Sequence, residues 1–191
     1  MILVTGATGH IGNVLVRQLL DDGEHVRALV RPGNATTALA GLNVELTPGD
    51  ILNIDSLEQA MQDVTLVYHL AAQISLGVGP DLETERVNLQ GTQNLIAAMR
   101  RSGAARLVYA SSIYALRRPA AGTPIDETQD FDAIHSQGAY DCSKARTSQV
   151  VQKAVAEGLE AVIVCPTAVT GPYDFHDSEA GRAIGCICVR G

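Results

Sequence analysis

Tyr140 and Lys144 stand four residues apart in the segment YDCSK, residues 140–144, and together they could transfer a proton. The helical pattern of residues 140–157 places positions i and i+4 on one face, so the phenol and the ammonium point the same way. A free phenol has a pKa of about 10, and a neighbouring ammonium lowers this pKa by favouring the phenolate. The pair therefore predicts an acid–base group, with a surface pair of no chemical role as the alternative.

Ser111 and Ser112 end a predicted strand at residues 106–111. In an open parallel sheet, ligands bind outside the carboxyl ends of the strands. A serine hydroxyl at that edge can donate a hydrogen bond to a substrate carbonyl. We expect these serines to face the same crevice as the glycine loop described next, although both could also simply finish the strand.

The chain opens MILVTGATGHIG, in which Gly6, Gly9 and Gly12 recur every third residue after an apolar run. Gly6 permits a sharp turn off the first strand, Gly9 keeps the backbone bare for a pyrophosphate, and Gly12 lets the first helix pack closely on the sheet. The N-terminus of that helix offers amides and a partial positive charge to phosphate. Because a strand precedes the glycines and an amphipathic helix follows, the pattern favours nucleotide binding over a structural turn.

The end of the second predicted strand indicates which dinucleotide binds. Dinucleotide folds usually place an acid there for the adenosine 2′-hydroxyl, but this chain has Arg31. A guanidinium attracts a 2′-phosphate, which an acid would repel, so we expect NADP, with NAD as the alternative. A solvated strand end is the other explanation for Arg31. Asp50 and Ile51, after the third strand, are expected to meet the adenine or to form a cap or turn.

Strand-like and helical segments alternate along the chain. The apolar, β-branched runs are typical of strands buried on both faces of a parallel sheet, so we expect an α/β fold with helices on both faces. The predicted strands are Ile2–Thr5, His25–Arg31, Val44–Leu46, Leu66–Ala71, Arg106–Ser111 and Ala161–Cys165. The predicted helices start near Ile11, at a cap on Asp55 or Ser56, near Val87 and at Tyr140, and a last one covers Ser178–Val189. The long connection 113–138 is expected to contribute to substrate specificity.

Composition limits the classes of function. With 191 residues, 46% of them hydrophobic, the chain can bury the core of one domain. Its net charge of −7 and scattered Lys and Arg argue against nucleic-acid binding. No run approaches the roughly 20 apolar residues of a membrane helix, and no signal peptide precedes Ile2, so we expect a cytoplasmic protein. The four cysteines lack a zinc-site spacing, and His69 is expected to be a core residue rather than a ligand.

Seven segments, taken together, resemble the extended short-chain dehydrogenases/reductases. That group includes dihydroflavonol-4-reductase-like proteins and sugar-nucleotide epimerases and dehydratases, and the ALVRP around Arg31 resembles the reductase branch more. The resemblance implies a Rossmann-type doubly wound parallel sheet with strand order 3-2-1-4-5-6. The segments are TGATGHIG (5–12), GD (49–50), VYHLAA (67–72), VNLQGTQNL (87–95), VYASS (108–112), YDCSK (140–144) and PTAVTGPYD (166–174).

The resemblance also implies roles for single residues. Ser112 matches the serine that orients the substrate oxygen, and Tyr140 matches the general acid/base. Lys144 matches the lysine that lowers the tyrosine pKa and binds the nicotinamide ribose, and Asn88 matches an asparagine that supports the active-site helix. No metal is implied. The implied cofactor-binding residues are Gly6, Thr8, Gly9, His10, Ile11, Gly12, Arg31, Asp50, Ile51, Leu70, Ala71, Ala72, Tyr140, Lys144, Pro166 and Val169.

The implied reaction is reversible hydride transfer between NAD(P) and a small carbonyl or alcohol substrate, with a homodimer as the common assembly of the group. A nucleotide-sugar epimerase or dehydratase is the first alternative. A non-enzymatic dinucleotide-sensing module is the second, and the intact Tyr140–Lys144 pair argues against it. We expect residues 1–176 to form the NAD(P)-binding domain with the catalytic residues, and 177–191 to begin a C-terminal substrate lobe that is largely missing.

Overall fold

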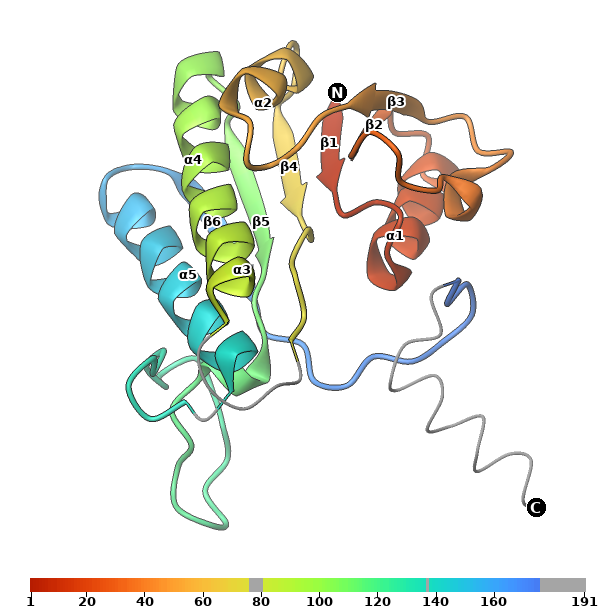
Figure 1. Ribbon diagram of the computed structural model, residues 1–191. Helices are drawn as coiled ribbons and strands as arrows, with labels where there is room; N and C mark the ends of the chain where they lie inside the picture. The colour runs from red at the N-terminus through yellow and green to blue at the C-terminus, as the bar shows by residue number, and fades with distance from the viewer. Residues whose placement is uncertain (76–80, 137, 176–191) are drawn as a thin grey trace, which may run out of the picture.

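Six parallel strands form one sheet in the order β3-β2-β1-β4-β5-β6 (Figure 1). This computed structural model describes residues 1–75, 81–136 and 138–175. The parallel sheet and its strand order are as predicted, and the strand ends differ from the predicted ones by at most two residues. The strands are β1 Ile2–Thr5, β2 Val26–Val30, β3 Glu45–Pro48, β4 Leu66–His69, β5 Arg106–Ala110 and β6 Glu160–Val164.

Helices cover both faces of the sheet (Figure 1). One face carries α1, and the other carries α2, α4 and α5, with α3 running into α4 through a π-helical turn. The predicted helix Ser178–Val189 and the predicted segment 177–191 lie outside the described residues. The helical elements are α1 His10–Asp21, η1 Thr37–Leu39, α2 Ile54–Ala60, α3 Leu82–Glu85, η2 Arg86–Gln90, α4 Gly91–Ser102, η3 Ile113–Ala115 and α5 Ala139–Ala156.

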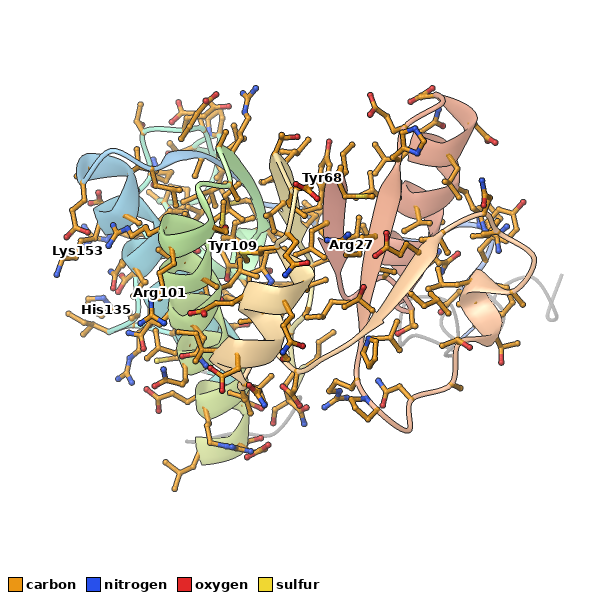
Figure 2. All side chains as sticks on the ribbon, turned by 90° about the horizontal axis from the view of Figure 1, so that it is seen from above. Arg27, Tyr68, Arg101, Tyr109, His135 and Lys153 are labelled. Atoms are coloured by element: carbon orange, nitrogen blue, oxygen red, sulfur yellow. The ribbon has the colours of Figure 1, made fainter. Side chains whose placement is uncertain are left out.

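Arg27 on β2 connects the edge strand β3 to the end of α2 through hydrogen bonds (Figure 2). Its Nε donates to the Glu45 carboxylate across the β2–β3 pair at 2.6 Å. Its Nη1 donates to the carbonyls of Ala60 and Gln62 at 2.8 and 2.7 Å, just where α2 ends. A single side chain thus satisfies carbonyls that the helix itself leaves unpaired.

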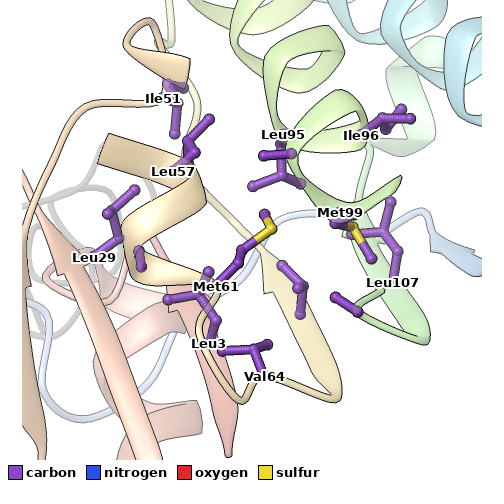
Figure 3. Packing of buried hydrophobic residues seen from close by; sticks show 14 of the residues in the cluster. Leu3, Leu29, Ile51, Leu57, Met61, Val64, Leu95, Ile96, Met99 and Leu107 are labelled. Atoms are coloured by element: carbon purple, nitrogen blue, oxygen red, sulfur yellow. The ribbon is translucent and has the colours of Figure 1, made fainter. Parts of the chain in front are cut away.

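The larger core lies between the sheet and α2, α4 and α5 (Figure 3). Leu3, Val67 and Leu107 are register partners on β1, β4 and β5 and form the floor of this core, meaning its sheet side. Leu95 and Met99 of α4 pack on this floor without solvent exposure. Each such side chain contributes roughly 1.5–3 kcal/mol of burial free energy, which holds α4 and its preceding turn against the strand ends.

The start of α2 differs from the prediction. Asn53, rather than Asp55 or Ser56, is the N-cap, and its side-chain oxygen accepts from the Ser56 amide at 3.2 Å. Asn53 has extended backbone angles (φ −111°, ψ 105°) and therefore stands just outside the helix, as a cap must. The Ser56 hydroxyl instead donates to the Asp50 carbonyl, which closes the turn between β3 and α2.

None of the helices within the described ranges is long and apolar enough to cross a membrane.

Candidate functional site

The glycine turn after β1 is built by close backbone contacts. Gly6 has a φ of +71°, and a Cβ there would lie 2.6 Å from the Ala71 backbone nitrogen. A Cβ at Gly12 would lie 2.1 Å from the Gly6 carbonyl oxygen. Gly12 thus allows α1 to approach the turn itself rather than the sheet. Gly6 thus turns the chain sharply, as predicted. Gly12 permits a close approach, also as predicted, but to the turn at Gly6 instead of to the sheet.

The N-terminus of α1 is open toward this turn. Gly9 is the N-cap, with no side chain to cap the helix, and the first turn carries no acidic residue. Free amides and the helix dipole at such an end attract phosphate oxygens.

A cleft of about 470 Å³ opens beside the glycine turn, among the loops that follow β1 to β4. It gathers most of the residues predicted to bind the cofactor. It also contains residues that sequence reasoning missed, because no local pattern marks a loop residue whose partner lies on another strand. The predicted residues that line it are Gly6, Thr8, Gly9, Arg31, Asp50, Ile51, Leu70, Ala71 and Ala72. The additional ones include Thr5, Asn34, Ala35, Gln73, Glu83 and Arg86.

His10 and Ile11, predicted to contact the cofactor, do not line the cleft. His10 Nε2 donates to the Pro172 carbonyl at 3.0 Å, so the ring faces the loop after β6 rather than the turn. Ile11 is 41% exposed on the outer side of α1. Only the backbone of these two residues, as the first turn of α1, is placed to act on a phosphate.

Asp50 forms the turn that the sequence allowed, and the contact of Asp50 and Ile51 with an adenine stays a prediction. The Asp50 carboxylate accepts from the Leu52 amide at 2.9 Å and so forms a turn. Ile51 is buried against Gly91 at the start of α4, where a Cβ would lie 2.6 Å from the Ile51 side chain. Both residues also line the cleft, at the end away from α5.

The two serines after β5 face different partners. Ser111 Oγ lies 2.6 Å from Ser148 Oγ of α5, in the buried interior. Ser112 accepts from the Tyr114 amide at 3.2 Å, and its hydroxyl also interacts with the Tyr140 phenol, which lowers the pKa of that phenol. Alternation along an extended backbone separates them, so the first serine is structural and the second meets the tyrosine.

Lys144 is almost fully buried, with 3% of its surface exposed. Its Nζ donates to the Ala110 carbonyl at 2.6 Å and lies 5.9 Å from the centre of the Tyr140 ring. Burial lowers the pKa of Lys144 to about 8. The pKa of Tyr140 is raised by burial, and the hydrogen bond from Ser112 opposes that rise. The net shift of the Tyr140 pKa is therefore upward, and the lowering of this pKa by Lys144 stays a prediction.

Asn88 lies in the π-helical turn and connects two elements of the site. Its Oδ1 accepts from the Gln73 amide at 2.7 Å, and its Nδ2 donates to the Gln73 carbonyl and to Ser143 Oγ at 3.0 and 2.9 Å. Ser143 in turn donates to the Tyr140 carbonyl at 2.8 Å. Since Gln73 lines the cleft, Asn88 joins the cleft wall to the first turn of α5.

Pro166 and Val169 lie after β6 and outside the cleft lining. The Pro166 carbonyl accepts from the Ile113 amide at 3.0 Å, which fixes this loop beside the segment that follows Ser112. Val169 is partly exposed. Their contact with a nicotinamide stays a prediction.

A second hollow, of about 520 Å³, lies next to the N-terminus of α5. The buried Asp132 organises it by accepting from the amides of Ile134 and His135 and from the His135 ring, at 3.0, 3.1 and 2.7 Å. These hydrogen bonds lower the pKa of Asp132 to about 2. The lining comes from the connection predicted to set specificity, together with α5, and comprises Tyr114, Leu116, Arg117, Arg118, Asp132, His135, Ser136 and Asp141.

Metal chemistry finds no support within the described ranges. These ranges contain no group of three or more His, Cys, Asp or Glu that could hold an ion. Cys142 and Cys165 are free thiols, and the Cys142 thiol faces the Ala133 carbonyl. Cys186 and Cys188 lie outside the described residues.

The sheet, the glycine turn and the cleft define a Rossmann-type dinucleotide-binding protein. The sequence profile of the NAD dependent epimerase/dehydratase family matches residues 2–188, and the chain belongs to this family. It is 39% identical over 182 residues to sterol demethylase protein B of Methylococcus capsulatus, covering 95% of this chain and 55% of that protein. It is 32% identical over 185 residues to mouse 3 beta-hydroxysteroid dehydrogenase type 7, covering 90% of this chain and 50% of that protein.

Solved structures agree with this assignment. A crystal structure of gox2253 superposes with a TM-score of 0.88 at 37% identity, covering 96% of this chain and 56% of that one. The UDP-glucose 4-epimerase of Thermus thermophilus, solved with NAD, gives a TM-score of 0.81 at 30% identity, covering 94% and 59%. The chain thus spans about half the length of its relatives. It is similar to NAD-dependent reductases and epimerases of the extended short-chain type, including a dihydroflavonol 4-reductase-like protein of Synechocystis.

Proposed function

We propose that this chain is the nucleotide-binding and catalytic part of an NADP-dependent reductase or dehydrogenase that acts on a small carbonyl or alcohol. The observation that carries the proposal is the pairing of Ser112 with Tyr140 at the carboxyl edge of the sheet. The cleft beside the glycine turn opens at the same edge, after β1 to β4. Ligands of open parallel sheets bind there.

The residues of the cleft fit a dinucleotide. The open N-terminus of α1 suits a pyrophosphate, Gly9 presents backbone without a side chain to the cleft, and Ile51 offers an apolar surface to an adenine. When bound, NAD(P) supplies the hydride. The chain itself has to bind the cofactor, orient the substrate and move one proton.

In the reductive direction, the Tyr140 phenol donates its proton to the substrate oxygen. The phenol carries its proton at neutral pH, as a general acid must before the transfer, but its raised pKa makes it a weaker proton donor. Ser112 donates a hydrogen bond to the same oxygen as negative charge develops on it. Lys144 contributes a nearby positive charge that favours the phenolate left behind, since the Coulomb attraction acts in a water-poor site.

Arg31 supports NADP over NAD. It follows β2, lines the cleft with Asn34, and forms no ion pair within the described part of the chain. A free guanidinium at this position is available to a 2′-phosphate. Replacing it by aspartate, R31D, is expected to weaken NADPH binding at least tenfold and to leave NADH binding similar or tighter. An unchanged ratio of the two dissociation constants would rule out this role.

The central test compares cofactor binding with turnover. NADPH fluorescence titration of the 191-residue chain should give saturable binding, and the Tyr140→Phe variant should bind within about twofold while losing at least about 100-fold in carbonyl reduction. Tyr68→Phe is the matched control, because Tyr68 lies on β4 and packs toward the α1 face. Equal turnover by Tyr140→Phe would remove the phenol from the mechanism.

A nucleotide-sugar epimerase or dehydratase is the second candidate. It is favoured by the likeness to the Thermus thermophilus UDP-glucose 4-epimerase, whose structure holds NAD. Nicotinamide cofactor that copurifies with the chain, and turnover without added cofactor, would favour this candidate over the reductase. A cytoplasmic location and a homodimer stay predictions.

A further inference from the structure

A row of polar side chains separates the apolar core from the carboxyl edge of the sheet. Thr5, His69 and Tyr109 are register partners on β1, β4 and β5, two residues beyond the apolar row of the core. All three are buried and face α4 and α5. Figure 2 shows Tyr109 in the interior of the molecule. Buried polar groups are usually hydrogen-bonded, so the bonds that Thr5 and His69 form carry information, whereas the buried Tyr109 hydroxyl has no hydrogen-bond partner within the described residues.

Both ring nitrogens of His69 are engaged. Nδ1 lies 2.7 Å from Thr5 Oγ1, and Nε2 lies 2.9 Å from Thr92 Oγ1 on α4. The Thr92 hydroxyl donates to the Asn88 carbonyl at 2.8 Å, so it accepts from His69, and the proton of the ring is on Nε2. Nδ1 then accepts from the Thr5 hydroxyl, whose oxygen accepts from the Ala71 amide at 3.3 Å.

The hydrogen bonds extend to both sides, and at Asn88 the connection passes through the residue itself, from its backbone carbonyl to its side chain. On one side they reach Ala71, which lines the cleft and packs against Gly6. On the other side they reach Asn88, whose side chain donates to Ser143, and Ser143 donates to the Tyr140 carbonyl. The hydroxyl groups of Thr5, Thr92 and Ser143 each donate one hydrogen bond and accept another, so no two donors or two acceptors face each other.

The surroundings keep the imidazole neutral. The groups that face it are the Tyr109 ring, with centroids 5.7 Å apart, and the Lys144 ammonium. Burial first, and then the Lys144 charge, lower the pKa of His69 to about 3. A proton on Nδ1 would also leave the Thr5 hydroxyl without its acceptor, so one charge state and one tautomer satisfy the whole series.

We propose that His69 is a positioning residue, which fixes the cofactor-binding turn relative to Asn88 and the first turn of α5 through Thr5 and Thr92. The proposal rests on the proposed function, because the two parts that His69 connects are the cofactor cleft and the catalytic tyrosine. The proposal has a specific consequence: a substitution at Thr92, which does not line the cleft, should weaken cofactor binding.

The tautomer can be measured without cofactor or substrate. Nitrogen-15 NMR of the histidines in the full 191-residue chain, with His69→Asn to assign the signal, should show one protonated and one unprotonated ring nitrogen for His69, with the proton on Nε2. The signal should stay constant from about pH 5 to about pH 9, a range that includes the pKa of about 6.5 of a free histidine. A titration of His69 in this range, or a proton on Nδ1, would overturn the assignment.

Cofactor binding tests the connection. Thr92→Val removes the hydroxyl with little change of shape and should weaken NADPH binding about tenfold. In a His69→Phe background, the same substitution should change the dissociation constant by less than about twofold, since the connection is already broken. Thermal unfolding of each variant identifies any that fails to fold.

Thr147→Val is the matched control. Thr147 is also a buried helical threonine that donates to the carbonyl four residues earlier, but in the described part of the chain His69 has its hydrogen bonds with Thr5 and Thr92 instead. We expect it to bind NADPH like the unaltered chain, within about twofold. If Thr92→Val binds NADPH as tightly as Thr147→Val, His69 has no positioning role. If the unaltered chain binds neither NADPH nor NADH, it is the proposed function that fails, and the NMR measurement still decides the hydrogen-bond series.

Discussion

The buried charge of Lys144 makes the stability of this protein depend on pH in a defined direction. The folded-state pKa is about 8, against 10.5 for an ordinary lysine. Between these two values the unfolded chain binds more protons than the folded chain. The free energy of unfolding that Lys144 contributes therefore rises with pH in this window, and below it the whole cost of burying the charge is present.

The size of the effect follows from the same two pKa values. Each factor of ten in proton affinity corresponds to about 1.4 kcal/mol, so the full effect is limited to about 3 kcal/mol. Between about pH 7 and about pH 9.5, where unfolding experiments are practical, the gain amounts to about 2 kcal/mol. Other groups, including the Tyr140 phenol and the Cys165 thiol, have raised pKa values and oppose this gain as they begin to ionise.

The comparison of Lys144 with Lys144→Met isolates its part. Urea unfolding of both proteins should be measured across this pH window. The free energy of unfolding of the unaltered chain should rise by about 2 kcal/mol relative to that of Lys144→Met. Lys144→Met also loses the hydrogen bond to the Ala110 carbonyl. That loss lowers the free energy of unfolding of the variant by the same amount at every pH, so it does not change how this free energy depends on pH. Parallel curves, or a relative loss of stability with rising pH, would show that Lys144 is not a buried ammonium with a depressed pKa.

Two further substitutions test how the site is supported. Gly12→Ala places a methyl group 2.1 Å from the Gly6 carbonyl oxygen, so we expect the free energy of unfolding in urea to fall by about 2–3 kcal/mol and NADPH binding to weaken. Gly171→Ala is the control, because its added methyl meets nothing closer than 3.9 Å, and it should change the free energy of unfolding by no more than about 0.5 kcal/mol. A tolerated Gly12→Ala would mean that α1 does not approach the turn this closely. Arg27→Ala leaves carbonyls at the end of α2 unpaired and should cost about 1–2 kcal/mol, while Arg106→Ala, in an exposed ion pair, should cost less than about 0.5 kcal/mol. Equal losses would show that Arg27 contributes only a surface ion pair.

The parallel sheet and the cofactor cleft could be predicted from the sequence because their signals are local, whereas the strand order was implied by the family resemblance. The apolar runs identify the strands, and parallel strands with crossover helices leave few arrangements. The glycine turn is equally local, since its φ and close approach depend on residues a few positions apart. Arg31, Asp50 and Ala71 then reach the cleft because each directly follows a strand, or nearly so, at one edge of the sheet.

Contacts between distant residues were beyond sequence reasoning. His10 meets Pro172, which is 162 positions away, and nothing in the glycine pattern announces that partner. Lys144 meets the Ala110 carbonyl, so its effect on Tyr140 depends on where a strand end stops. The Tyr-x-x-x-Lys spacing places both residues on one helix, but it does not say which acceptor the ammonium chooses or how far burial moves either pKa.

The two serines after β5 show how one backbone geometry divides structure from chemistry. The extended backbone at Ser112, with φ −157° and ψ 149°, points it away from the side that Ser111 occupies. Ser111 consequently joins Ser148 in the interior and holds β5 to α5, while Ser112 remains at the edge with Tyr140. The hydrogen bond between Ser111 and Ser148 joins the end of β5, which Ser112 follows, to α5, which carries Tyr140. We therefore expect the placement of the two predicted catalytic residues to depend on a contact that neither of them makes.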